Sequence, residues 1–176
     1  MKTAAILITL FLIMPFANAG APARLIASFH PVNGTNVRGT VVFERSGNKV
    51  KVTASVGGLY PKREHHLGIH EFGDLGSPDA SSAGGLFRVG EKQTGNLGVL
   101  KADLDGNARL SVTLDRVSLG TGASGILGRS VVIRVSPKEN ENPTERLAAG
   151  VIGIAFQAES PAPSDDEDKE KTRRAE

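Results

Sequence analysis

The chain has 176 residues, with 21 lysines and arginines against 19 acidic residues, and contains no cysteine. A net charge of +2 and an aromatic content of 5% argue against a nucleic-acid surface built on a basic patch or on stacking aromatics. Without cysteine there is neither a disulfide nor a thiol nucleophile, so stability must come from an ordinary core.

The N-terminus has the pattern of an export signal. Lys2 precedes an apolar stretch over residues 4–16, and residues 17–19 (ANA) have the small-x-small pattern that signal peptidase cleaves. The apolar stretch is shorter than the roughly 20 residues that a membrane span needs. We therefore expect residues 1–19 to be a signal peptide rather than a membrane span, and the mature protein to be periplasmic or secreted.

Alternation of apolar and polar residues dominates the chain after the signal and predicts β-strands. The clearest segment is KVKVTASV, residues 49–56, whose apolar residues at even positions are expected to face a core. Similar patterns predict six further strands, at residues 24–30, 37–45, 66–72, 99–104, 108–115 and 130–135, and the continuous apolar run at 147–156 is suited to a central strand. Asn33-Gly34 and the turn residues 46–48 and 105–107 separate neighbouring strands. The prediction is an all-β fold, an eight-stranded antiparallel Greek-key barrel or sandwich.

Three connections are longer than hairpins require, at residues 73–98, 118–128 and 136–146. The first has 26 residues rich in glycine and serine. Loops beyond about 15 residues in a compact domain tend to be functional or disordered. Local function is therefore expected on these loops.

The C-terminal stretch SPAPSDDEDKEKTRRAE, residues 160–176, contains six acids, four bases and no large apolar residue. Such a segment cannot bury enough apolar surface to offset the entropy of ordering. We expect it to be a disordered charged tail, so that residues 20–159 form a single domain.

Five sequence blocks occur in a definite order: GIHEFGD (68–74), SAGGLF (82–87), GNLGVLKADLDGNA (95–108), GILGRSVVI (125–133) and RLAAGVIGIA (146–155). In order and spacing they resemble the copper/zinc superoxide dismutases, over roughly residues 24–157. The resemblance implies an eight-stranded Greek-key barrel with copper and zinc as cofactors, a zinc-type loop at 73–98 and an electrostatic-type loop at 136–146. It also leaves open a homodimer, because dimer surfaces differ within that family.

The same resemblance implies that most metal ligands are missing. His70 is the one ligand position that keeps its histidine, and Arg146 matches the active-site arginine of the family. The second of the family's two cysteines corresponds to Ala149. The remaining matched ligand positions hold residues that would not replace a metal-binding histidine or aspartate, namely Gly68, Leu86, Gln93, Asn96 and Arg134.

Two neighbouring histidines, His65 and His66, are weak additional candidates for a copper or zinc site. His66 and His70 share a face of the predicted strand, whereas His65 points the other way. At about 3.3 Å per residue, His66 and His70 lie roughly 13 Å apart along a regular strand, too far for one ion with bonds of about 2 Å. We interpret His65 and His66 as exposed polar residues, and His70 as a core-facing histidine bonded to a backbone carbonyl.

The replacements suggest that the former metal pocket has changed character. Arg134 is expected to fill the space left by copper, and Leu86 to make one side of the pocket apolar. Arg134 and Arg146 are predicted to face one depression, and two guanidiniums repel each other unless something negative lies between them. The neutralising group would be a small anion or a carboxylate, with candidates Glu71, Glu139, Glu141 and Glu145.

The sequence thus favours an exported superoxide dismutase-like protein that has lost metal binding and activity, carries no cofactor, and serves as a binding or structural scaffold. Whether it is an enzyme stays open. One alternative is a dismutase with a degenerate site, which would convert superoxide to oxygen and hydrogen peroxide. Another is a surface copper or zinc binder that uses His65, His66 and His70. The sequence identifies no protein partner.

Overall fold

The computed structural model describes residues 22–136 and 145–156. The predicted signal peptide and the predicted tail lie outside these residues. Within the two described ranges, no helix has the length and apolarity required to span a membrane.

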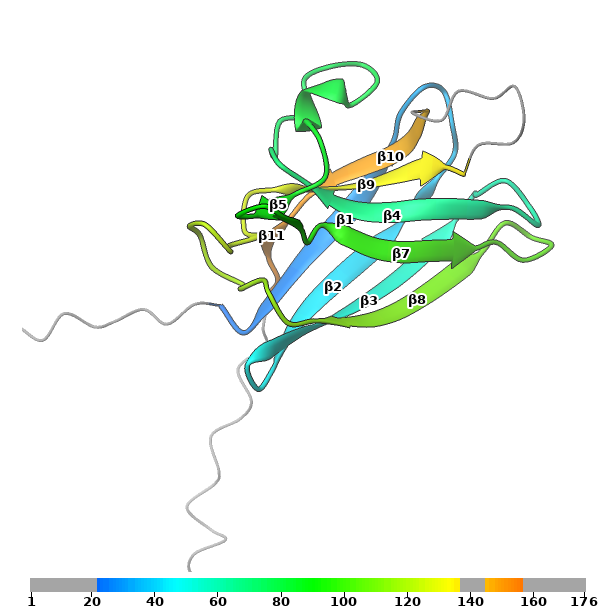
Figure 1. Cartoon of the computed structure of the whole chain (residues 1–176). Coiled ribbons are helices and arrows are strands. Elements are labelled where there is room, and N and C mark those ends of the chain that lie inside the picture. The colour runs from blue at the N-terminus through cyan, green and yellow to red at the C-terminus, as the bar shows by residue number, and fades with distance from the viewer. Residues whose placement is uncertain (1–21, 137–144, 157–176) are drawn as a thin grey trace, which may run out of the picture.

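One antiparallel sheet curls into a nearly closed barrel (Figure 1). Its strands follow the order β7-β4-β9-β10-β1-β2-β3-β8, with β11 also paired to β1, and a separate ribbon pairs β5 with β6. Consecutive strands β3 and β4 are far apart in this order, so the predicted Greek-key barrel is confirmed. The elements are β1 (Arg24–Pro31), β2 (Arg38–Ser46), β3 (Lys49–Gly57), β4 (Glu64–His70), the 3₁₀ helix η1 (Ser81–Ala83), β5 (Arg88–Val89), β6 (Lys92–Gln93), β7 (Asn96–Lys101), β8 (Ala108–Leu114), β9 (Ser130–Val135), β10 (Arg146–Val151) and β11 (Gly153–Ile154).

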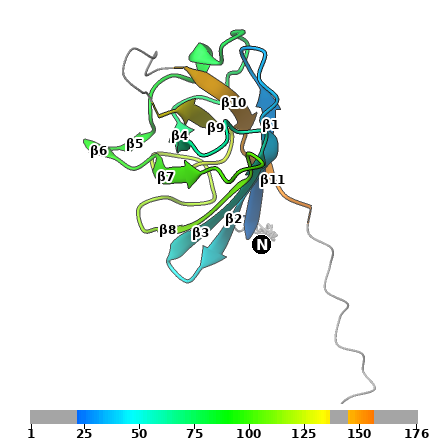
Figure 2. The same ribbon diagram turned by 90° about the vertical axis from the view of Figure 1, so that its right-hand side faces the viewer.

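The core lies between a layer of β1, β2, β3 and β8 and a layer of β4, β7, β9 and β10 (Figure 2). The predicted alternation is present in β3, where the even-numbered residues from Val50 to Val56 are buried and their neighbours are exposed. Phe43, Leu67 and Ile133 are fully buried between the layers. Burying each such side chain contributes about 1.5–3 kcal/mol, so the barrel has an ordinary apolar core.

Three predicted strands had wrong bounds, and one of them, expected at 66–72, is β4, which begins and ends two residues earlier. The strand expected at 99–104 is β7, which begins and ends three residues earlier. It ends because the carboxylate of Asp103 accepts the backbone N–H groups of Asp105 (2.9 Å) and Asn107 (2.8 Å), which turns the chain. The strand expected at 147–156 is divided at Ile152, which exchanges hydrogen bonds with Gly128 and Arg129 before β11 pairs with β1.

The predicted long connection occupies residues 71–95 and contains η1, β5 and β6. It rises from the end of β4 and returns to the start of β7 (Figure 1). Backbone bonds attach it to the end of β4: Glu71 N donates to Gly85 O (3.0 Å), and Phe87 N donates to Ile69 O (2.9 Å). These bonds place residues 80–86 directly beside His70.

Candidate functional site

His70, the last residue of β4, is buried and 1% exposed. Its Nδ1 lies 2.9 Å from the carbonyl oxygen of Gly84, and its Nε2 has no partner among the described residues. Burial lowers the pKa of His70 to about 4, the charges of Arg146 and Arg134 act in the same direction, and the Gly84 bond and Glu71 oppose the shift. His70 is therefore neutral near pH 7, donating from Nδ1 and carrying a lone pair on Nε2.

Arg146 begins β10 and reaches across to the long loop. Its Nη1 donates to the carbonyl of Ala80 and its Nη2 to the carbonyl of Gly84 at 3.0 Å. Burial lowers the pKa of Arg146, the nearby charge of Asp79 opposes that shift, and Arg134 adds to it. The carbonyl of Gly84 therefore accepts hydrogen bonds from both His70 and Arg146.

The carboxylate whose charge acts on Arg146 is Asp79, which the sequence interpretation had not included among its candidates. Glu71 instead accepts the backbone N–H of Gly85 at 3.1 Å. Of the other candidates, Glu139 and Glu141 lie outside the described residues. Only spatial proximity could identify Asp79, because it is distant in sequence from both arginines.

Arg134 is half-buried and lies opposite Arg146 across the β9–β10 pair and opposite His66 across the β9–β4 pair. Its charge acts on both His70 and Arg146. The two arginines that the sequence placed at one depression are therefore neighbours. Arg134 is opposite His66 and not His70 in β4, but its permanent charge still reaches His70 and opposes the entry of a metal cation there.

Gly68 and Leu86 occupy one space. A Cβ atom built on Gly68 would lie 2.3 Å from Cδ2 of Leu86, shorter than a normal contact between non-bonded carbon atoms, so the Leu86 side chain would have to shift. Leu86 also forms an isolated antiparallel bridge with His70. The hydrocarbon of Leu86 therefore fills the position from which a residue-68 side chain would project toward His70.

The remaining matched ligand positions do not converge on His70. Gln93 is exposed in β6, and Asn96 is exposed at the start of β7, where its Oδ1 accepts the N–H of Gly98 at 3.1 Å. In the ranges that the structure describes, no three histidine, aspartate or glutamate side chains lie close enough together to hold a metal ion. The residues present thus do not fit the copper and zinc that the fold implies.

His65 was expected to be exposed, and that prediction was wrong. The strand begins at Glu64, two residues earlier than predicted, so His65 faces the interior with Leu67 and is 0% exposed. Neither ring nitrogen of His65 has a hydrogen-bond partner within residues 22–136 and 145–156. Burial and then the charge of Arg63 lower the pKa of His65, and the backbone of Arg63 opposes the shift.

His66 lies on the opposite face from His65. It is half-buried, and its Nε2 lies 3.0 Å from the hydroxyl of Ser136. The three histidines of β4 therefore do not share one surface site.

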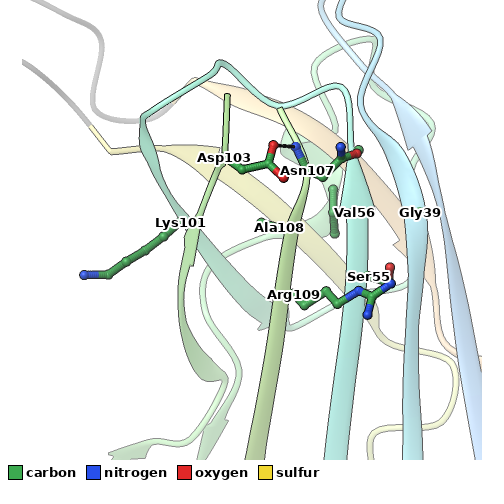
Figure 3. Close-up of a pocket in the computed structure, with 9 residues that line it drawn as sticks. Gly39, Ser55, Val56, Lys101, Asp103, Asn107, Ala108 and Arg109 are labelled. Atoms are coloured by element: carbon green, nitrogen blue, oxygen red, sulfur yellow. Dashed lines mark hydrogen bonds between the residues drawn. The ribbon is translucent and has the colours of Figure 1, made fainter. Parts of the chain in front are cut away.

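A surface depression of about 560 Å³ lies elsewhere on the barrel (Figure 3). Its two cations do not converge: Lys101 points away and pairs with Glu64 at 3.0 Å, whereas Arg109 extends toward Ser55. The carboxylate of Asp103 is occupied by the turn that ends β7. The charged side chains of this depression therefore do not converge on one point, and the region around His70 stays the better candidate for a functional site.

Comparison with known proteins covers most of the barrel, from β2 to β10. The family model described as copper/zinc superoxide dismutase matches residues 37–152. The Cu-Zn superoxide dismutase of Humicola lutea is 33% identical over 144 residues, covering 69% of this chain and 93% of the relative. The extracellular Cu-Zn superoxide dismutase of Brugia pahangi is 29% identical over 157 residues, covering 76% of this chain and 77% of the relative.

Among solved structures, a crystal structure of the clock protein EA4 is similar, with a TM-score of 0.65 and 30% identity. The similarity covers 77% of this chain and 96% of that chain. The matched family region includes every ligand position discussed above, so the replacements lie within the matched domain. The chain therefore belongs to the copper/zinc superoxide dismutase family.

Proposed function

We propose that this protein is an exported member of the family that has lost copper and zinc binding and dismutase activity, and that it serves as a metal-free binding or structural scaffold. The observation that carries the proposal is the fit of Leu86 into the space above Gly68. Two ligand positions have been replaced by residues that pack against each other. A histidine restored at position 68 alone would collide with Leu86.

Charge supports the same conclusion. Dismutation needs an ion that changes oxidation state while several imidazoles hold it, whereas at this site the Nε2 atom of His70 is one imidazole nitrogen without a partner among the described residues. The charges of Arg146 and Arg134 both act on His70 and repel a cation. Two nitrogens of Arg146 are also engaged by loop carbonyls, which supports a structural role for this arginine.

Export is supported by the sequence of residues 1–19 and by the similarity to the extracellular enzyme of Brugia pahangi. Secretion of full-length chain can be tested directly by fractionating cells that express it and determining the N-terminal residue of the exported product. Export with Gly20 at the N-terminus agrees with the proposal, whereas an intact N-terminus on a protein retained in the cytoplasm contradicts it.

Metal content and activity measured on one sample test the loss of function. The purified mature protein is incubated with copper and zinc, dialysed, and divided between elemental analysis and a superoxide dismutase assay. We expect metal well below one ion per chain and no activity above that of a His70→Asn control. Stoichiometric copper together with dismutase activity that the control lacks would overturn the proposal.

For a partner, we propose a second copy of the chain. Large apolar side chains are exposed at Phe72 (58%), Val151 (45%) and Ile154 (66%), and the Val151 side chain lies within 3.5 Å of the Cβ position of Gly73. Exposed apolar patches of this kind mark interaction sites. Sedimentation velocity should detect a dimer that Ile154→Glu dissociates, and a monomeric wild type at all concentrations would contradict this assignment.

A further inference from the structure

The residues of the former metal site fasten the long loop to the barrel. We infer that Gly68, His70, Gly84, Leu86 and Arg146 form a metal-free latch that holds residues 71–95 against β4 and β10. This inference rests on the proposed function, because a bound metal would give the same residues another task. The latch has a polar part and an apolar part, and each is visible in specific contacts.

The polar part is the carbonyl of Gly84. It accepts a hydrogen bond from Nδ1 of His70 at 2.9 Å and from Nη2 of Arg146 at 3.0 Å. His70 ends β4 and Arg146 begins β10, so two strands hold one point of the loop. Arg146 adds a bond to the carbonyl of Ala80, on the other side of η1. Buried carbonyls need such donors, and charged donors provide the stronger bonds.

The apolar part is the contact of Leu86 with Gly68. Glycine is often required where the backbone adopts a positive φ, but Gly68 has no such φ. Gly68 instead leaves room for Leu86: a Cβ at position 68 would lie 2.3 Å from Leu86 Cδ2, so any other residue there requires the end of the Leu86 side chain to move. Because Gly68 has no side chain, it leaves a gap in the surface of β4, which we call the notch. The side chain of Leu86 in the loop fills this notch.

A small buried apolar cluster adds a further contact between the loop and the barrel. Ala80 and Ala83 of the loop pack with Val132 of β9 and Ala149 of β10, and each is at most 1% exposed. Close packing of small side chains leaves no water between the loop and these strands. Apolar contact therefore joins loop and barrel at Ala149, in a chain that has no cysteine to form a disulfide.

The latch makes the effects of substitutions at positions 68 and 86 interdependent. Gly68→Ala should displace Leu86, and Leu86→Ala should empty the notch. Once Leu86 has been shortened, however, the added methyl group at position 68 has room. Residues in direct contact show coupling of this kind, whereas independent sites give additive effects.

A double-mutant cycle read by amide hydrogen exchange tests the inference. The reporters are the amides of Glu71, Phe72 and Phe87, which bond to Gly85 O, Ala83 O and Ile69 O. Each single variant, Gly68→Ala and Leu86→Ala, should raise their exchange rates by about 10-fold, and the double variant should stay near the Leu86→Ala rate. Gly153→Ala is the matched control, because nothing lies within 4 Å of its Cβ position and its φ is ordinary.

Failure of the latch can be distinguished from failure of the proposed function. The latch is wrong, even though no metal binds, if the two substitutions have multiplicative effects on the exchange rates of the reporter amides. It is also wrong if these amides exchange no faster in the Gly68→Ala variant than in the Gly153→Ala variant. The same reporters measured in wild-type protein with added copper and zinc, and again with chelator, should not change. Slower exchange with metal would instead overturn the proposed loss of metal binding.

Discussion

Acidification should destabilise the barrel through His70, and the structure determines the size of the effect. The pKa of His70 is lowered from 6.5 to about 4 in the folded protein, so between these values the unfolded chain binds the proton more readily. The contribution of neutral His70 to the free energy of unfolding is therefore fully present above pH 6.5 and is lost as the pH falls toward 4. From pH 7.5 to pH 4.5 the linkage relation gives a loss of about 2–3 kcal/mol from this one residue.

The variant His70→Asn isolates this contribution. An asparagine Nδ2 can still donate to Gly84 O as Nδ1 of His70 does, but it does not titrate. Free energies of unfolding from urea titrations at pH 7.5, 6.5, 5.5 and 4.5 should fall more steeply for wild type than for the variant, by about 2–3 kcal/mol over the series. His30→Asn, at an exposed residue of β1, is the matched control. A difference between wild type and His70→Asn that stays the same at every pH would show that the titration of His70 does not destabilise the barrel.

Four further outcomes are expected. Removing metals with chelator should leave the thermal midpoint unchanged; a fall of many degrees would reveal a metal that supports the fold. Arg134→His should not create stoichiometric copper binding while Gly68 and Leu86 remain, and copper titration followed by dialysis would show a contrary result. His65→Leu should raise the unfolding free energy by about 1–2 kcal/mol at pH 7.5, because both ring nitrogens of His65 are buried without partners among the described residues. The gain should be larger at pH 5, because the pKa of His65 is lowered in the folded protein. An unfolding free energy from urea titration that equals that of wild type would contradict this. Cutting the chain after Glu159 should change that free energy by less than about 0.5 kcal/mol, and a loss above roughly 1 kcal/mol would mean that the tail docks on the barrel.

The sequence predicted the barrel well because strand formation depends on a local signal. Alternation in residues 49–56 specifies which side chains face the core of β3, and the turn signals at residues 46–48 and 105–107 separate the strands that the structure contains. The resemblance then supplied the strand connections, and it identified which ligand positions had changed. Where the pattern was ambiguous, at the ends of β4 and β7, the predicted boundaries shifted by two or three residues.

The environment of each candidate site residue depends on contacts between residues that are distant in sequence. The burial of His65 follows from where β4 begins, because a strand that starts at Glu64 includes His65 and places it on the same buried face as Leu67. Asp79 lies near Arg146 because η1 folds back toward β10, and Leu86 fits above Gly68 because the loop returns to β4. Sequence by itself determined the all-β fold, and the resemblance predicted which residues stand at the matched ligand positions. Tertiary structure alone decided how Gly68 and Leu86 fit together, because steric fit and burial depend on distances that residue order does not contain.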